Sequence, residues 1–277
     1  MLKQLPTFPI LVDYRAATTW TKPVEDLALA ALRPRSRVCG IVLQRPTNGM
    51  VKLFRALSRP FPELESVDVS PPLDHELILP AKFLSDSLPR LRRLTLRRVV
   101  PGSLFPLLSF TTGLVELKLS LRANTTSNLN TLPEYSLLPD LQRMSCLRRL
   151  DLDYGPKSFR ISPPVAPAGA EVVVPLPMLT HLILWGRKLH LKALVVGLVA
   201  APSLQHLDVE LSGPSSRAFP ILHLCKFICN SECQFTTTRL DFSPSKLEFY
   251  AGTSSESIDD KPFRVIIPRP VSWEQMG

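Results

Sequence analysis

The feature that most constrains the fold of this chain is a repeated pattern, Leu-x-x-Leu-x-Leu with aliphatic substitutions. Successive copies begin 23 to 33 residues apart, close to the period of roughly 20–29 residues that is typical of leucine-rich repeats. The copies are Val38–Leu43, Leu64–Val69, Leu91–Leu96, Leu114–Leu119, Leu147–Leu152, Leu179–Leu184 and Leu204–Val209.

Each copy alternates apolar and polar side chains, as a short strand with one buried face does. Between the copies, apolar residues recur at three- and four-residue intervals, which predicts helices. These segments are Val24–Leu32, Met50–Leu57, Ala81–Leu88, Ser103–Phe110, Tyr135–Met144, Leu189–Ala200 and Ala218–Cys229. One strand and helix cannot bury their apolar faces alone, so neighbouring units must stack. The sequence therefore predicts an α/β leucine-rich-repeat solenoid with a parallel concave sheet and convex helices.

Prolines support this division of the chain. Pro62, Pro89, Pro177 and Pro202 each lie two residues before the first aliphatic residue of a copy. Proline lacks a backbone donor and disfavours helical dihedrals in the residue before it, so a helix must end there.

We expect three regions. Residues 1–35 form an N-terminal cap with a helix, and residues 36–235 form about seven repeats. A surface loop at Asn124–Asn130 and a proline-rich insertion at 156–177 interrupt the repeats. Residues 236–277 form a C-terminal cap and tail, in which Thr238–Phe242, Lys246–Tyr250 and Phe263–Ile267 alternate as strands do.

Charge and cysteine content restrict the setting. The net charge is +9, and its excess lies in residues 1–100, which hold 16 basic and 9 acidic side chains. The odd number of cysteines, 5, argues against a disulfide framework. The N-terminus has no secretory pattern and no apolar stretch is long enough for a membrane span. We expect a monomeric cytoplasmic or nuclear protein that does not bind a membrane.

The quoted repeats also carry a resemblance to a known family. The segments Ser36–Leu43, Phe61–Val69, Phe83–Leu96, Thr112–Leu119 and Pro202–Val209 resemble the F-box-like leucine-rich-repeat proteins of mushroom-forming fungi, and the likeness runs from about Leu5 to Tyr250. The resemblance implies repeats that select a protein substrate and an N-terminal F-box that docks to the Skp adaptor of a ubiquitin ligase. Thr7–Tyr14 lacks the helical pattern that follows the start of an F-box. We expect a truncated member that meets the Skp adaptor only if an F-box exists upstream.

Residues that flank the buried strand positions should face solvent on the concave sheet, where solenoids usually bind. Trp185 would anchor a protein partner there, unless the proline-rich insertion folds over it. The candidate partner-binding residues are Arg93, Arg97, Lys118, Arg149, Asp151, Asp153, His181, Ile183, Trp185, His206, Asp208 and Glu210. His181 and His206 occupy equivalent positions in adjacent repeats, so we expect them to be neighbours.

Three other patterns carry less weight. The basic cluster Arg90–Arg98 could meet phosphates, but no aromatic residue interleaves it, which favours a solvated surface or an acidic partner over nucleic acid. Cys225, Cys229 and Cys233, with His223 nearby, match no common zinc spacing, and a packed helix face accounts for them. No catalytic or phosphate-loop motif is present, so we expect no enzyme activity and no cofactor.

Overall fold

The structure is a computed structural model, and the chain forms two compact units, Met1–Ser127 (unit 1) and Asn128–Gly277 (unit 2). The structure describes residues 8–15, 21–44, 51–72, 76–80, 82–84, 88–100, 103–121, 137–154, 174–187, 201–212, 237–243, 246–252 and 263–267.

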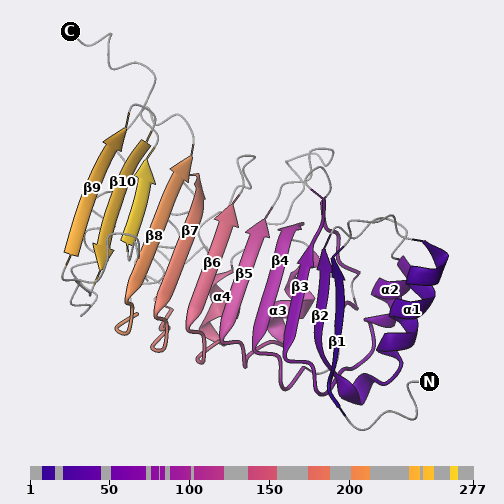
Figure 1. Ribbon diagram of the computed structural model, residues 1–277. Helices are drawn as coiled ribbons and strands as arrows, with labels where there is room; N and C mark the ends of the chain where they lie inside the picture. The colour runs from indigo at the N-terminus through magenta and orange to yellow at the C-terminus, as the bar shows by residue number, and fades with distance from the viewer. Residues whose placement is uncertain are drawn as a thin grey trace. The chain divides into compact units, whose positions relative to one another are not determined.

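Unit 1 contains a parallel sheet whose strands follow the order of the chain (Figure 1). Among the described residues of unit 1, four short helices lie between these strands in the sequence. They are α1 (Lys22–Leu32), the 3-10 helix η2 (Arg35–Arg37), α2 (Val51–Ala56) and α3 (Phe105–Ser109). The strands are β1 (Ile10–Arg15), β2 (Val38–Gln44), β3 (Ser66–Ser70), β4 (Arg93–Val99) and β5 (Glu116–Leu121).

Unit 2 begins with the same arrangement. Helix α4 (Leu138–Gln142) precedes three parallel strands, β6 (Arg149–Tyr154), β7 (His181–Arg187) and β8 (His206–Ser212). In Figure 1, α3 and α4 lie behind the strands of their own units, so the viewer sees the sheet face opposite these helices. The predicted α/β class and the parallel strands of the repeats are confirmed.

The aliphatic pattern explains the sheet in each unit. The three aliphatic residues that define each of the seven copies are buried, each at most 2% exposed. Parallel pairing aligns Val67 with Leu94 and Leu94 with Leu117 in unit 1, and Leu150, Leu182 and Leu207 in the same way in unit 2. Each buried row is therefore a continuous aliphatic ladder, which removes apolar surface from water along the whole row.

The turn before each strand also follows from the sequence. Pro62, Pro89, Pro177 and Pro202 lie in turns immediately before the first aliphatic residue of a copy. In these turns the amide of that residue donates a backbone hydrogen bond to the carbonyl three positions earlier, as from Leu91 to Leu88 and from Leu204 to Ala201. Proline suits the second position of such a turn because its φ is fixed and its missing donor is not needed there.

Two segments differ from the sequence prediction. Ile10–Arg15, for which no strand was predicted, is strand β1 and pairs with β2. The helix predicted at Ala81–Leu88 is wrong for the described residues 82–84, which form a turn in which Leu84 has a φ of 51°. Such a left-handed φ is incompatible with an α-helix. The apolar spacing there reflects core filling instead, since Phe83, Leu84 and Leu88 are all buried.

The remaining predicted helices divide into two groups. Those at Val24–Leu32, Met50–Leu57, Ser103–Phe110 and Tyr135–Met144 correspond to α1, α2, α3 and α4. Those at Leu189–Ala200 and Ala218–Cys229 lie outside the described residues, as do Asn124–Asn130 and the insertion up to residue 173.

The predicted C-terminal strands are present, but they do not all continue the parallel pattern. They are β9 (Thr237–Ser243), β10 (Lys246–Gly252) and β11 (Phe263–Ile267). β11 pairs parallel to β8, whereas β10 runs antiparallel to β11 and to β9. The last of the described strands, β11, therefore lies next to β8, where the strand of a further repeat would be expected.

Among the described residues, no helix combines the length and the apolar character that crossing a membrane would require.

The aliphatic ladder makes a direct prediction for unit 1. Leu94 on β4 is fully buried, so Leu94→Ala should lower the free energy of unfolding by about 2–5 kcal/mol, because apolar burial decreases and a cavity is left behind. Urea denaturation measures this difference. The matched control is Arg93→Ala, since Arg93 is the neighbouring exposed residue of the same strand and should change stability by no more than about 0.5 kcal/mol. Equal destabilisation by both variants would contradict the assigned faces of β4.

Candidate protein-binding surface

The strands of unit 2 arrange their outward residues in three rows. Parallel pairing aligns Arg149, His181 and His206 in the first row. The second row holds Asp151, Ile183 and Asp208, and the third holds Asp153, Trp185 and the backbone of Glu210. We call the face of β6, β7 and β8 that carries these rows the unit 2 surface. Its residues alternate with the buried leucines of the same strands, so the sequence-predicted positions in unit 2 are brought together on one sheet.

The first row contains a stacked pair of imidazole rings. The ring centroids of His181 and His206 lie 4.2 Å apart with an angle of 23° between the ring planes. The Nδ1 atom of His181 lies 2.9 Å from the hydroxyl oxygen of Thr180, within hydrogen-bonding distance. The prediction that these histidines are neighbours is confirmed, and its basis is that equivalent positions of adjacent parallel strands lie one strand spacing apart.

Trp185 is the large apolar side chain that this surface exposes to solvent. It is 43% exposed, although it lies on the middle strand, β7, between β6 and β8. Its register partners Asp153 and Glu210 are both acidic residues. An exposed tryptophan with polar neighbours is typical of an interface hot spot, because the indole offers a large apolar area and one hydrogen-bond donor.

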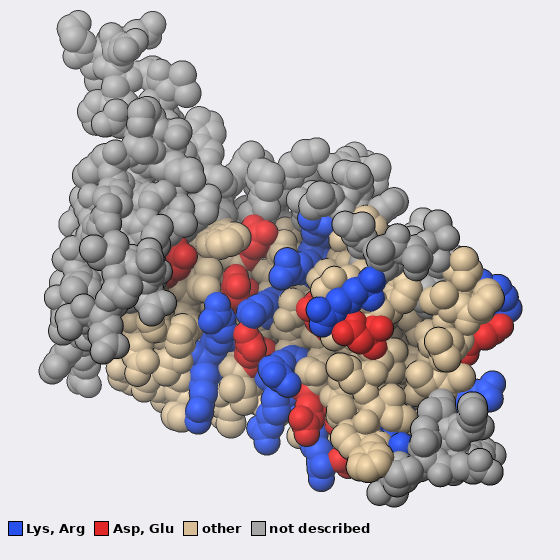
Figure 2. Space-filling view, in the orientation of Figure 1, with Lys and Arg blue, Asp and Glu red and all other residues tan. Residues whose placement is uncertain are grey.

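Unit 1 carries a second outward face, on β4 and β5. Arg93 aligns with Glu116, and Thr95 aligns with Lys118. The Nζ atom of Lys118 forms an ion pair of 2.8 Å with Glu116. Basic and acidic side chains are interspersed on the face seen in Figure 2, so the unit 1 face presents mixed charge.

The basic cluster Arg90–Arg98 does not form a single cationic patch. Arg90 pairs with Glu63. Arg92 donates to the carbonyl oxygen of Gly113 at 3.2 Å, and Arg98 donates to that of Pro71 at 3.0 Å. These arginines bind groups of the protein itself, whereas Arg93 and Arg97 are exposed on the sheet face. Few of the guanidinium groups in the cluster are therefore available to contact phosphates together.

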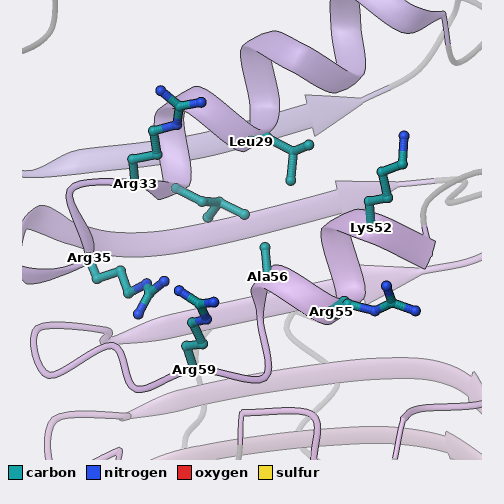
Figure 3. A pocket seen from close by; sticks show the side chains of 8 residues that line it. Leu29, Arg33, Arg35, Lys52, Arg55, Ala56 and Arg59 are labelled. Carbon is teal, nitrogen blue, oxygen red and sulfur yellow. The ribbon is translucent and has the colours of Figure 1, made fainter.

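Sequence reasoning missed a basic pocket beside α1 and α2 (Figure 3). Its cationic lining consists of Arg33, Arg35, Lys52, Arg55 and Arg59. Lys52, Arg55 and Arg59 are spaced so that they lie on one side of a helix and its continuation. This spacing could have indicated a basic surface, but the prediction of a helix at Met50–Leu57 rested on its apolar residues alone.

An ion pair connects the two helices at this pocket. The Nζ atom of Lys52 on α2 donates to the carboxylate of Glu25 on α1 at 2.9 Å, and Lys22 lies 3.6 Å from the same carboxylate. Glu25 is only 8% exposed. The hydrogen bond from Lys52 lowers the pKa of Glu25 below its usual value of 4.5, because it stabilises the charged form.

Cys225, Cys229, Cys233 and His223 lie outside the described residues. Within the described part of the chain, no group of histidine, cysteine, aspartate and glutamate residues is arranged to hold a metal ion.

Comparison of the chain with family models, with curated proteins and with solved structures finds no match.

The Glu25–Lys52 pair predicts a pH dependence of stability. Since the pKa of Glu25 is lower in the folded state, the pair contributes stability above the ordinary pKa of 4.5 and loses it as the pH falls through the folded pKa. Glu25→Gln should therefore be less stable than the wild type at neutral pH, and the difference should shrink below pH 4.5. Urea denaturation over a pH series measures it.

The control for this prediction is Asp26→Asn. Asp26 pairs with Lys22 within α1 and does not connect α1 to α2. Its substitution should cost less at neutral pH than Glu25→Gln does. A stability difference for Glu25→Gln that stays constant down to strongly acidic pH would show that the carboxylate is not the stabilising group.

Proposed function

We propose that this chain is a protein-binding repeat module and that the unit 2 surface receives its partner. The observation that carries the proposal is the exposure of Trp185 on the middle strand of a parallel sheet, between acidic register partners. Burying a tryptophan against a partner yields a large apolar contact, and charged neighbours orient the partner without dominating the affinity.

The rest of the surface suits recognition better than chemistry. The stacked imidazoles of His181 and His206 are joined by a hydrogen-bonding contact to Thr180. Arg149 lies beside His181 in the first row, and Asp151 lies beside Ile183 in the second. Such a surface offers donors, acceptors and apolar area at fixed strand spacings, which is what a rigid protein-recognition face requires.

The more specific part of the proposal rests on the resemblance to fungal F-box-like leucine-rich-repeat proteins. In this proposal the repeats are the substrate-recognition region of a ubiquitin-ligase adaptor, and docking to the Skp adaptor needs an F-box upstream. The proposal would be supported by co-purification of the Skp adaptor with the complete gene product. A gene product without an F-box that fails to bind the adaptor would overturn this part and leave the protein-binding proposal standing.

The alternative function, an acidic partner or nucleic acid bound through Arg90–Arg98, receives less support. Arg90, Arg92 and Arg98 already bind groups of unit 1. A nucleic-acid surface needs several cations presented together to the phosphate backbone.

Substitution of Trp185 tests the proposal. Wild-type protein and Trp185→Ala are each used as bait in quantitative affinity capture, with label-free mass spectrometry of the recovered proteins. Because hot-spot truncation typically costs about 2 kcal/mol or more, we expect recovery of specific partners to fall by at least roughly tenfold in the variant.

The matched control is Met178→Ala. Met178 is 45% exposed, almost the same fraction as Trp185, but it lies in the turn before β7. Its substitution should leave the captured set unchanged. Recovery of the same partners in equal amounts by wild type and Trp185→Ala would contradict the proposal.

A further inference from the structure

The basic pocket of unit 1 concentrates positive charge without neutralising it. Glu25 pairs with Lys52 at the pocket, but within the described residues the side chains of Arg33, Arg35, Arg55 and Arg59 form no ion pair and no hydrogen bond. Guanidinium groups stay charged at all relevant pH values. Four like charges thus gather around one hollow, which is unfavourable unless an anion or the solvent compensates.

Two of these arginines converge. Arg35, in the short helix after α1, and Arg59, just after α2, point their guanidinium groups toward one another (Figure 3). Arg33, Lys52 and Arg55 line the rim of the pocket, and in Figure 3 their charged ends point away from this pair. A guanidinium presents a planar fork of donors that matches phosphate oxygens, so two facing forks form a receptor for a tetrahedral oxyanion.

The pocket is large enough for a small anion. Its volume is about 340 Å³, near the lower limit of the roughly 300–1,000 Å³ that is typical of ligand sites. Its apolar lining consists of Leu29, Leu32 and Ala56. None of the lining residues is aromatic, and single-stranded nucleic acid is usually held by stacking on aromatic rings. The hollow therefore fits a compact anion better than a nucleic-acid strand.

We propose that the basic pocket binds a small oligophosphate, an anion with at least two linked phosphate groups. One phosphate lies between Arg35 and Arg59, and a second is contacted by Arg33 or Arg55 when its flexible side chain turns inward from the rim. The ligand contacts both the α1 and the α2 side of the pocket, so its binding holds these helices together. This site is separate from the unit 2 surface, and its function does not depend on the proposed protein partner.

Isothermal titration calorimetry and thermal unfolding of the full chain test the proposal. The probes are inorganic phosphate, pyrophosphate and triphosphate, with sulfate at matched ionic strength as the control for unspecific screening. We expect affinity to rise from phosphate to triphosphate, and the melting temperature to rise with triphosphate concentration, because the ligand binds the folded state. Equal effects of sulfate and triphosphate would overturn the proposal.

The variant Arg35→Gln/Arg59→Gln removes the facing pair. Since each charge-assisted hydrogen bond to the ligand contributes on the order of a tenfold change in affinity, we expect triphosphate binding to weaken by at least about tenfold. Arg35→Lys/Arg59→Lys keeps the charge without the planar forks, so its affinity should lie between those of the Gln variant and the wild type. Circular dichroism verifies that each variant is folded.

The matched control is Arg143→Gln/Arg148→Gln, which removes two exposed arginines of unit 2. It reduces the net charge by the same amount but should bind triphosphate as the wild type does. Equal weakening by the control would show a general charge effect and would overturn the site.

A further arm of the experiment distinguishes the source of the phosphate groups. Wild-type protein is tested for sedimentation with vesicles that contain a multiply phosphorylated inositol lipid, and for binding to a phosphoserine peptide. Binding to either of these without binding to free triphosphate would contradict a small-molecule ligand.

Discussion

The structure depends on one constraint, the burial of aliphatic side chains in rows that run across parallel strands. A single strand of this chain exposes a stripe of leucine that it cannot cover alone. The rows through Leu94 and Leu117 in unit 1, and through Leu150, Leu182 and Leu207 in unit 2, remove these stripes from water. Turns with proline in the second position start the strands at the right residue, as before Leu91 and Leu204.

The candidate binding surface is a consequence of the same constraint. Because side chains alternate along a strand, fixing the leucines inward fixes their neighbours outward. Adjacent parallel strands then bring equivalent positions together, which is why His181 stacks on His206 and why Trp185 lies beside Asp153. Evolution can change the outward residues of a repeat at little cost to the core, and this freedom is what makes a repeat sheet suitable for recognition.

Much of the fold could be predicted from the sequence because its determinants are local. The period-two pattern located β2 to β8, and the apolar spacing located α1 to α4. β1 escaped detection because Ile10–Arg15 lacks the leucine pattern, and its pairing with β2 depends on a segment 28 residues further along the chain. A helix was wrongly predicted at Ala81–Leu88 because buried apolar residues in a turn, such as Phe83 and Leu84, can have the same spacing as those of a helix.

Strand pairings and sites that join distant segments of the chain were harder to predict from the sequence. Three C-terminal strands could be foreseen from their alternation, but the insertion of β11 between β8 and β10 could not, since it depends on contacts between segments about 55 residues apart. The basic pocket joins Arg35 and Arg59, whose proximity arises only when α2 packs beside α1. The outward positions of β6 to β8 were predictable, whereas the extent to which Trp185 is exposed required the structure.

Both the buried rows and the candidate surface depend on the parallel register of the strands, and paired cysteines test this register most directly. Arg93 aligns with Glu116, and Thr95 aligns with Lys118. We expect both double variants, Arg93→Cys/Glu116→Cys and Thr95→Cys/Lys118→Cys, to form a disulfide under mild oxidation, detected by mass spectrometry of the linked peptides. An antiparallel arrangement can bring only one of these pairs within disulfide-bonding distance. The formation of one disulfide without the other, or of neither, would therefore contradict the parallel register.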